Sequence, residues 1–183
     1  YGRRLFGDQM IPAALAARSL GRPVKLIFDR ASDSRFDCVR SPSVCTLEAF
    51  FDSDGALTGV DHAVVAGWPT KSMAPFFLGP GIDGKGEVDG FSVNGADHWY
   101  TLPSHRVRTM NNALAQETFL PGWLRAVGPG WVSWGVESFF DEIADQQGAD
   151  PVALRLQLLD AAGKNAGDNA KTVGGAQRLA AVL

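Results

Sequence analysis

Cysteine is scarce in this chain, and its two copies exclude most thiol-based sites. Six residues separate Cys38 from Cys45, a spacing that matches neither a zinc pattern nor a C-x-x-C redox pair. A disulfide between them would require an oxidising compartment. We predict two half-buried free thiols and keep the disulfide as the alternative.

Long apolar runs are missing too. No stretch approaches the ~20 apolar residues of a membrane-crossing helix, and no signal peptide is visible. The chain begins with Tyr1 and closes on a run with helical spacing, residues 175–183. We therefore expect an internal piece of a larger protein. Its 183 residues, 45% of them hydrophobic, are enough for a folded core.

A general excess of positive charge is absent as well. The net charge of −3 argues against nucleic acid as a partner. The sign is uneven, since residues 1–50 hold eight Lys/Arg against five Asp/Glu, and residues 51–183 hold nine against fifteen. A locally basic first third fits a phosphate-bearing ligand, although arginines on a solvated surface explain the same bias.

Common catalytic motifs are not found: there is no P-loop, dinucleotide fingerprint or G-x-S-x-G element. The three histidines, His62, His98 and His105, do not have metal-ligand spacing. We predict that each is a hydrogen-bonded core or surface residue.

The first third of the chain predicts one helix, one strand and a β-hairpin. An alanine-rich run from about Met10 to Gly21 indicates a helix. The compact apolar run 23–28 predicts a buried strand, followed by a polar connection over residues 29–42. Residues 44–51 and 56–66 flank an Asp-Gly turn and predict the hairpin.

The remainder predicts a long loop, a strand and two helices. Residues 67–95 contain seven glycines and three prolines and predict an irregular loop, whereas residues 99–110 resemble a strand. A helix that ends at Gly148 is predicted by five apolar residues at helical spacing: Val132, Val136, Phe139, Phe140 and Ile143. Asp150-Pro151 caps a further helix whose apolar face is predicted to carry Val152, Leu156 and Leu159. The fold class is α+β, a mixed sheet with a β-hairpin and packed C-terminal helices.

A Gly/Pro-rich loop with one arginine is the main candidate for a ligand site. It has the sequence PGWLRAVG, residues 121–128, and opens directly into the first of the two helices. Glycines, a fixed cation at Arg125 and backbone N–H groups at a helix start suit a bulky anion. The alternative is an arginine that only bridges the loop to a helix C-terminus.

Charged residues on the two final helices have a structural interpretation. We predict that Arg155 pairs with a nearby carboxylate and locks the helix pair together. Glu137, Asp141 and Glu142 are predicted to form a solvated charged face without acid–base roles.

Several motifs together resemble one family. Tyr1-Gly2-Arg3-Arg4 resembles the tail of a GGGFGRR motif, and residues 121–128 resemble PTGWWRSVG and the FRGFGG loop. Residues 137–144, 148–159 and 21–30 resemble ESFIDELA, GxDPvexRlxLL and GxPVKLIWTR. The chain is thus similar to the molybdopterin-binding large subunits of the xanthine dehydrogenase/aldehyde oxidase superfamily. The nearest branch is that of the isoquinoline 1-oxidoreductase beta-subunit and membrane-bound aldehyde dehydrogenase.

The resemblance implies part of a molybdenum-cofactor-binding domain, residues 1–183 being a central segment of the large subunit. Within it, residues 1–66 would hold a helix, strand and hairpin, 67–110 a long loop and strands, and 111–183 the cofactor loop and helices. The implied cofactor is molybdenum-molybdopterin, in the cytosine dinucleotide form. Eight residues are implied to contact it: Tyr1, Gly2, Arg3, Trp123, Arg125, Ala126, Val127 and Gly128. Arg30 and Arg40 lie near the same motifs, with a structural role favoured.

The resemblance also implies what lies outside the chain. No residue matches the family's catalytic glutamate, so the chain has no catalytic residue and no metal ligand of its own. The [2Fe-2S] clusters would belong to a small partner subunit, with a c-type cytochrome as a further partner. Such an assembly suggests the periplasm or the periplasmic face of the inner membrane, with the cytoplasm as alternative.

Two positions bear on the substrate. Leu5 stands where xanthine dehydrogenases carry a glutamate, and Val127 stands where FRGFGG has its second phenylalanine, which removes an aromatic wall. An aldehyde or an aromatic N-heterocycle is therefore the expected substrate. The alternatives are a non-catalytic scaffold that retains the fold, and an unrelated phosphate binder supported only by Gly2, Arg3 and Arg4.

Overall fold

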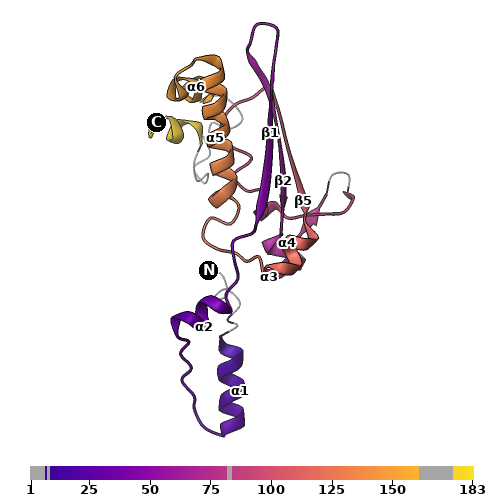
Figure 1. The fold of residues 1–183 in the computed structure, drawn as a ribbon, viewed down its shortest axis with the longest axis vertical. Coiled ribbons are helices and arrows are strands. Elements are labelled where there is room, and N and C mark those ends of the chain that lie inside the picture. The colour runs from indigo at the N-terminus through magenta and orange to yellow at the C-terminus, as the bar shows by residue number, and fades with distance from the viewer. Residues whose placement is uncertain (1–6, 8, 82–83, 161–174) are drawn as a thin grey trace. The chain divides into compact units, whose positions relative to one another are not determined.

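The computed structural model describes residue 7 and residues 9–81, 84–160 and 175–183. They form helices and two small sheets, which confirms the predicted mixed α+β class (Figure 1). The chain divides into two compact units. The first unit takes in Tyr1–Ser43, Val65–Ser92 and Asn111–Val127, and the second takes in Val44–Val64, Val93–Met110 and Gly128–Leu183.

The main sheet has three strands in the order β1-β2-β5: β1 (Ser43–Phe51), β2 (Leu57–Ala66) and β5 (Ser104–Asn111). β1 and β2 form the predicted hairpin. Half-buried and exposed residues alternate along β1 and β5, which is typical of a sheet with one face on a core.

The hairpin turn is closed by Asp52. Its N–H donates to the Ala56 carbonyl at 3.0 Å, and its carboxylate accepts from the N–H groups of Asp54 and Ala56. Gly55 has φ 82°, the left-handed conformation that the Asp-Gly pair predicts.

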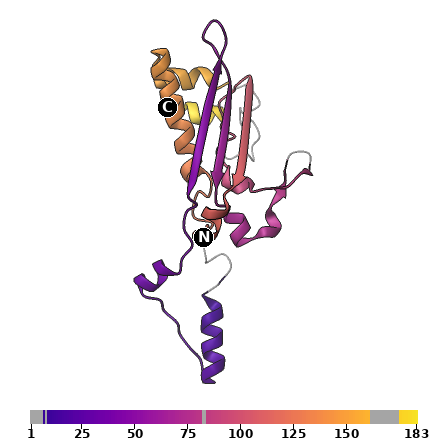
Figure 2. The same ribbon diagram turned by 45° about the vertical axis from the view of Figure 1, so that its right-hand side comes forward.

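Helix α5 (Pro129–Gln147) covers the core face of the sheet (Figure 2). Four of the five predicted apolar positions are fully buried, and the fifth, Phe139, packs at the margin. The helix ends as predicted, because Gly148 at φ 62° stops it. Its buried residues are Val132, Gly135, Val136, Phe140, Ile143 and Ala144.

Helix α6 (Pro151–Leu158) begins at the predicted cap. The Asp150 carboxylate accepts from the N–H groups of Val152 at 3.0 Å and Ala153 at 2.8 Å. The predicted face is wrong for Val152 and Leu156, which are 39% and 45% exposed, while Leu154 is buried. The segment is apolar on both sides, so helical spacing alone did not fix its rotation.

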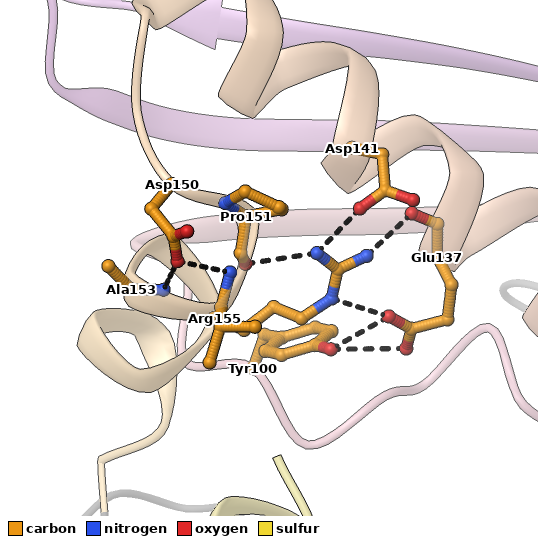
Figure 3. Close-up of polar contacts among 8 residues, drawn as sticks. Tyr100, Glu137, Asp141, Asp150, Pro151, Ala153 and Arg155 are labelled. Atoms are coloured by element: carbon orange, nitrogen blue, oxygen red, sulfur yellow. Dashed lines mark hydrogen bonds and ion pairs between the residues drawn. The ribbon is translucent and has the colours of Figure 1, made fainter.

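The buried Arg155 side chain joins α6 to α5 through a polar network (Figure 3). Its guanidinium pairs with Glu137 at 2.9 Å and Asp141 at 2.8 Å, and donates to the Glu137 carbonyl at 2.8 Å. The Tyr100 hydroxyl donates to Glu137 at 2.9 Å. The predicted pairing of Arg155 with a carboxylate is therefore confirmed, and Glu137 and Asp141 serve that pairing.

In the first unit, α1 (Met10–Leu20) occupies its predicted range and ends at Gly21, φ 62°. The buried strand predicted for residues 23–28 is wrong. This segment is extended but has no paired strand among the described residues, and Ile27 is 73% exposed (Figure 1). An apolar, β-branched run supplies strand propensity without specifying a hydrogen-bonding partner.

The predicted polar connection over residues 29–42 contains a short helix, α2 (Arg30–Arg35). The Asp29 carboxylate caps it by accepting from the Ser32 N–H at 2.7 Å. This hydrogen bond favours the charged carboxylate and lowers the pKa of Asp29. A further short helix, α4 (Ala113–Thr118), is capped by Asn112, whose side chain accepts from the Ala115 N–H at 2.8 Å.

The predicted irregular loop 67–95 contains several short elements. These are α3 (Pro69–Met73), the 3-10 turns η2 (Pro75–Phe77) and η4 (Gly90–Ser92), and the paired strands β3 (Gly79–Pro80) and β4 (Glu87–Val88). Asp89 ties two of them together, because its buried carboxylate accepts from Thr70 N–H at 2.9 Å, Thr70 Oγ1 at 2.6 Å and Phe91 N–H at 3.0 Å.

Neither cysteine is in a disulfide; Cys38 is buried and Cys45 is half-buried. Burial raises the pKa of the Cys45 thiol. The disulfide alternative is thus excluded in this structure.

Candidate functional site

Five of the predicted cofactor contacts lie in one described loop, residues 121–128. Trp123 is 8% exposed, whereas Arg125 and Ala126 are at the surface, and Gly128 is the N-cap of α5. Tyr1, Gly2 and Arg3 lie outside the described residues, as do Arg4 and Leu5. Of the predicted site, the structure therefore describes the loop 121–128 and not the Tyr1-Gly2-Arg3 segment.

The loop starts from a tightly packed backbone pair. Val39 donates its N–H to the Leu120 carbonyl at 2.9 Å, and its own carbonyl accepts from Gly122 N–H at 3.0 Å. A Cβ on Gly122 would lie 2.1 Å from Cys38 Sγ, so that only glycine fits there. The buried Cys38 and this glycine fix where the loop begins.

The buried Trp123 side chain anchors the loop to residues 70–91. Its indole N–H donates to Thr70 Oγ1 at 3.2 Å, and that hydroxyl donates in turn to the buried Asp89 carboxylate. Its ring lies 6.2 Å from Phe77 and 5.4 Å from Phe91, centroid to centroid. Aromatic packing with a satisfied N–H makes Trp123 a rigid support for the residues that follow it.

Arg40 holds the exposed half of the loop. Its guanidinium donates to three consecutive carbonyls, those of Arg125 at 2.9 Å, Ala126 at 2.9 Å and Val127 at 3.3 Å. No described carboxylate forms an ion pair with Arg40. The loop thus gains a positive charge that is not neutralised by an acidic partner in the described part of the chain.

Ala126 shows why the loop needs this support. At φ 57° it is the one non-glycine residue with positive φ among those described. The left-handed conformation costs an L-residue about 1–2 kcal/mol. Hydrogen bonds to a charged group contribute about 1.5–3 kcal/mol each when sheltered and less at a surface, so three of them are enough to offset that cost.

The loop therefore has the properties of an anion site. The N–H groups of Ala126 and Val127 donate to no other described residue, and the loop has its own Arg125 beside the contacting Arg40. Neighbouring N–H groups around a left-handed residue bind anionic oxygens. These features fit a phosphate-bearing cofactor held by the Arg125 side chain and by loop N–H groups.

The histidines lie in the second unit and form a group of their own. His98 stacks on His105 at 4.5 Å and meets Phe140 edge-on at 5.5 Å. Burial, with a smaller effect of His105, lowers the pKa of His62 from 6.5 to about 4 and that of His98 to about 3. His62 has no hydrogen-bond partner among the described residues, so the predicted hydrogen-bonded state is wrong for it. His62 is buried, and His98 and His105 are half-buried.

A pocket of about 370 Å³ lies between residues 94–100 and the first turns of α5. Its polar walls include Asp97, His98, Tyr100 and Glu137. Of these, Tyr100 and Glu137 already serve the Arg155 network. Burial and then the Glu137 charge raise the pKa of Tyr100, which keeps its hydroxyl a donor. Trp123, Arg125, Ala126, Val127 and Gly128, the predicted cofactor contacts that the structure describes, do not line this pocket.

Within the described residues, no group of three or more His, Cys, Asp or Glu side chains is placed to hold a metal ion. None of the helices there combines the length and apolar character that a bilayer crossing needs.

An α+β chain with a Gly/Pro loop that carries Arg125 and is contacted by Arg40 has the features expected of a domain for an anionic cofactor. A family model for the molybdopterin cofactor-binding domain matches residues 5–159. The chain belongs to that family.

Named relatives are consistent with the match. The chain is 52% identical over 184 residues to the membrane-bound aldehyde dehydrogenase [pyrroloquinoline-quinone] of Gluconacetobacter polyoxogenes. The match covers 100% of this chain and 24% of that protein. It is 26% identical over 168 residues to isoquinoline 1-oxidoreductase subunit beta of Brevundimonas diminuta, covering 91% of this chain and 20% of that protein. The chain thus spans about a quarter or less of the length of these relatives.

Among solved structures, the aldehyde oxidoreductase of Desulfovibrio gigas is similar in fold. The TM-score is 0.55 at 23% identity, over 79% of this chain and 15% of that one. The predicted family and the predicted α+β class are confirmed. The predicted cofactor contacts themselves remain predictions.

The main support of the loop, Arg40, is predicted from the sequence only as a structural residue. No sequence signal connects it with residues 125–127, which follow more than 80 positions later. The Thr70–Asp89 pair beneath Trp123 was hidden inside the predicted irregular loop. Both contacts depend on the tertiary fold.

Proposed function

We propose that this chain is part of the large catalytic subunit of a molybdenum hydroxylase that oxidises an aldehyde or an aromatic N-heterocycle. The observation that carries the proposal is the Arg40-held loop, which presents Arg125 and the Ala126 and Val127 N–H groups together. The match of residues 5–159 to the molybdopterin-binding family supports it.

In this proposal the chain supplies part of a cofactor cradle. Arg125 provides a permanent cation with forked donors, and the N–H groups of Ala126, Val127 and Gly128 provide neutral donors for anionic oxygens. Tyr1, Gly2 and Arg3 would add a second backbone segment. When bound, the molybdenum cofactor supplies the hydroxylation chemistry and accepts the substrate electrons. Trp123 contributes by fixing the loop from beneath.

The proposed partners are the remainder of the large subunit, a small subunit with [2Fe-2S] clusters and a c-type cytochrome. The cofactor would be the cytosine dinucleotide form of molybdopterin, and the assembly would work at the periplasmic face of the inner membrane. The relative from Gluconacetobacter is named as membrane-bound, which supports that location. The same name gives pyrroloquinoline-quinone to that protein. We favour molybdopterin because the matching family binds it.

A substitution pair tests the proposed role of the loop. In the full-length protein, Arg125→Ala removes the surface cation and should lower molybdenum content at least about tenfold, a loss of about 1.4 kcal/mol in cofactor binding. Arg125→Lys keeps the charge without the fork and should give an intermediate content. Arg35→Ala in α2, also an exposed arginine, is the control.

Metal analysis and extraction of bound quinone from the same samples separate the possible outcomes. Unchanged molybdenum in Arg125→Ala would remove the site assignment. If the wild type contains quinone and no molybdenum, the proposed cofactor is wrong and a quinone takes its place in the assignment. Neither molybdenum nor quinone would favour the scaffold alternative.

A further inference from the structure

Three successive carbonyls of the loop converge on one side chain from a distant segment. The two terminal nitrogens of Arg40 are engaged with the carbonyls of Arg125, Ala126 and Val127, at 2.9, 2.9 and 3.3 Å. A planar trans peptide directs its N–H opposite to its C=O. The N–H groups on the other side of these peptides therefore point away from Arg40.

The base of Arg40 is itself held in place. Val39 is bonded through both its N–H and its carbonyl to the strand-like residues 120–122. On the other side, Ser41 Oγ donates a short hydrogen bond to the Gly67 carbonyl. The guanidinium thus reaches the loop from a backbone fixed at both neighbours.

We infer that Arg40 is a positioning residue for the cofactor loop. By gathering the carbonyls on one side, it keeps Ala126 in its left-handed conformation and leaves the opposite N–H groups ready for an anionic oxygen. This inference rests on the proposed function of the loop. Arg40 acts through the loop backbone, because its terminal nitrogens are already engaged.

The first test uses full-length protein from cells that cannot build the cofactor, so that only the hold on the loop is measured. Trypsin cleavage after Arg125 reports how often the loop opens. Arg40→Ala should raise the cleavage rate about tenfold or more. Cleavage after Arg18 and Arg35, exposed in α1 and α2, should stay the same.

If the cleavage rate after Arg125 is equal in Arg40→Ala and wild type, the inference is overturned. If cleavage also rises after Arg18 and Arg35, the Arg40→Ala change has unfolded the first unit. The variant Arg40→Lys is then used to test the positioning role. A lysine keeps the charge but has a single nitrogen in place of the guanidinium fork. We expect selective, intermediate opening at Arg125. Cleavage identical to the wild type would contradict the proposed hold.

The second test uses protein from cells that build the cofactor and asks whether conformation is what Arg40 supplies. Arg40→Ala should lower the molybdenum content several-fold. Adding Ala126→Gly to it should restore part of that content, since glycine adopts the left-handed conformation without support. Ala126→Val should lower the content because a β-branched residue is strongly disfavoured at positive φ.

The outcomes separate the two proposals. A wild type without molybdenum contradicts the proposed function, yet the trypsin test of Arg40 still stands. Loss of molybdenum in Arg40→Ala with no recovery on adding Ala126→Gly would overturn the positioning role and leave Arg40 as a general stabiliser. Normal molybdenum content in Arg40→Ala would overturn it as well.

Discussion

Arg155 and Arg40 each join two segments of the chain, yet they do so with different partners. Arg155 is 7% exposed, and its guanidinium meets the carboxylates of Glu137 and Asp141 (Figure 3). Burial acts against this charge, but the hydrogen bonds that the guanidinium donates to the two carboxylates outweigh it and raise the pKa of Arg155. Arg40 is exposed, and its partners in the described part of the chain are carbonyl oxygens.

The difference shows how one residue type can serve the fold or prepare a site. The charge of Arg155 is neutralised by acidic partners, so the network is complete without a ligand. Carbonyl oxygens hold the Arg40 side chain without cancelling its charge, so the loop keeps an attraction for anions. If this is right, changes in the Arg155 network should alter the stability of the fold and leave molybdenum content unchanged.

The largest effect is expected for Arg155→Met. This change keeps much of the buried aliphatic length but removes the hydrogen bonds to α5, and should cost about 2–3 kcal/mol, because the released carboxylates are partly exposed and can be hydrated. Hydrogen-exchange protection of residues 132–158 in the full-length protein measures it. Arg35→Met in α2 should change protection by less than about 0.5 kcal/mol. A similarly small effect for Arg155→Met would contradict the network.

Acid should weaken the second unit through its histidines. The folded pKa values of His62 and His98, about 4 and about 3, lie below the 6.5 of an unfolded histidine. The unfolded chain therefore binds more protons at acidic pH, so this contribution is complete above pH 6.5 and is lost as the pH falls below it.

By about pH 5 the loss should reach about 2 kcal/mol, after allowance for partial solvation. Exchange protection of residues 96–110, corrected for the intrinsic pH dependence, measures it. His98→Phe removes one titrating ring and should flatten the slope by about half. A slope that is the same in this variant would exclude His98 as a source.

The smallest effect is expected for Tyr100→Phe. It removes the hydroxyl that donates to Glu137 at 2.9 Å and should cost about 1 kcal/mol in exchange protection of α5. Molybdenum content should not change, nor should it change in Glu137→Gln. A large loss of molybdenum in either variant would place the α5–α6 network at the cofactor.

Much of the regular structure could be predicted from local sequence. The Asp-Gly turn determined the hairpin, and five apolar residues ended by Gly148 determined α5, because both signals are local. The paired role of Arg155 was also predictable, since a long cation opposite an acidic helix face has few other partners. The resemblance of residues 121–128 located the loop that the family match includes.

The errors share a physical cause. Residues 23–28 have the composition of a strand, but composition does not say whether another strand is there to pair with it. α6 is apolar on two sides, so its rotation depends on where Arg155 must reach. The contact between Arg40 and the loop joins segments more than 80 residues apart, and only the tertiary fold brings them together.

Molybdenum per polypeptide in the native full-length protein tests the central claim most directly. The account predicts about one molybdenum per chain in cells supplied with molybdate and able to build the cofactor. A content near zero under the same conditions would contradict the assignment of the loop to a molybdenum cofactor.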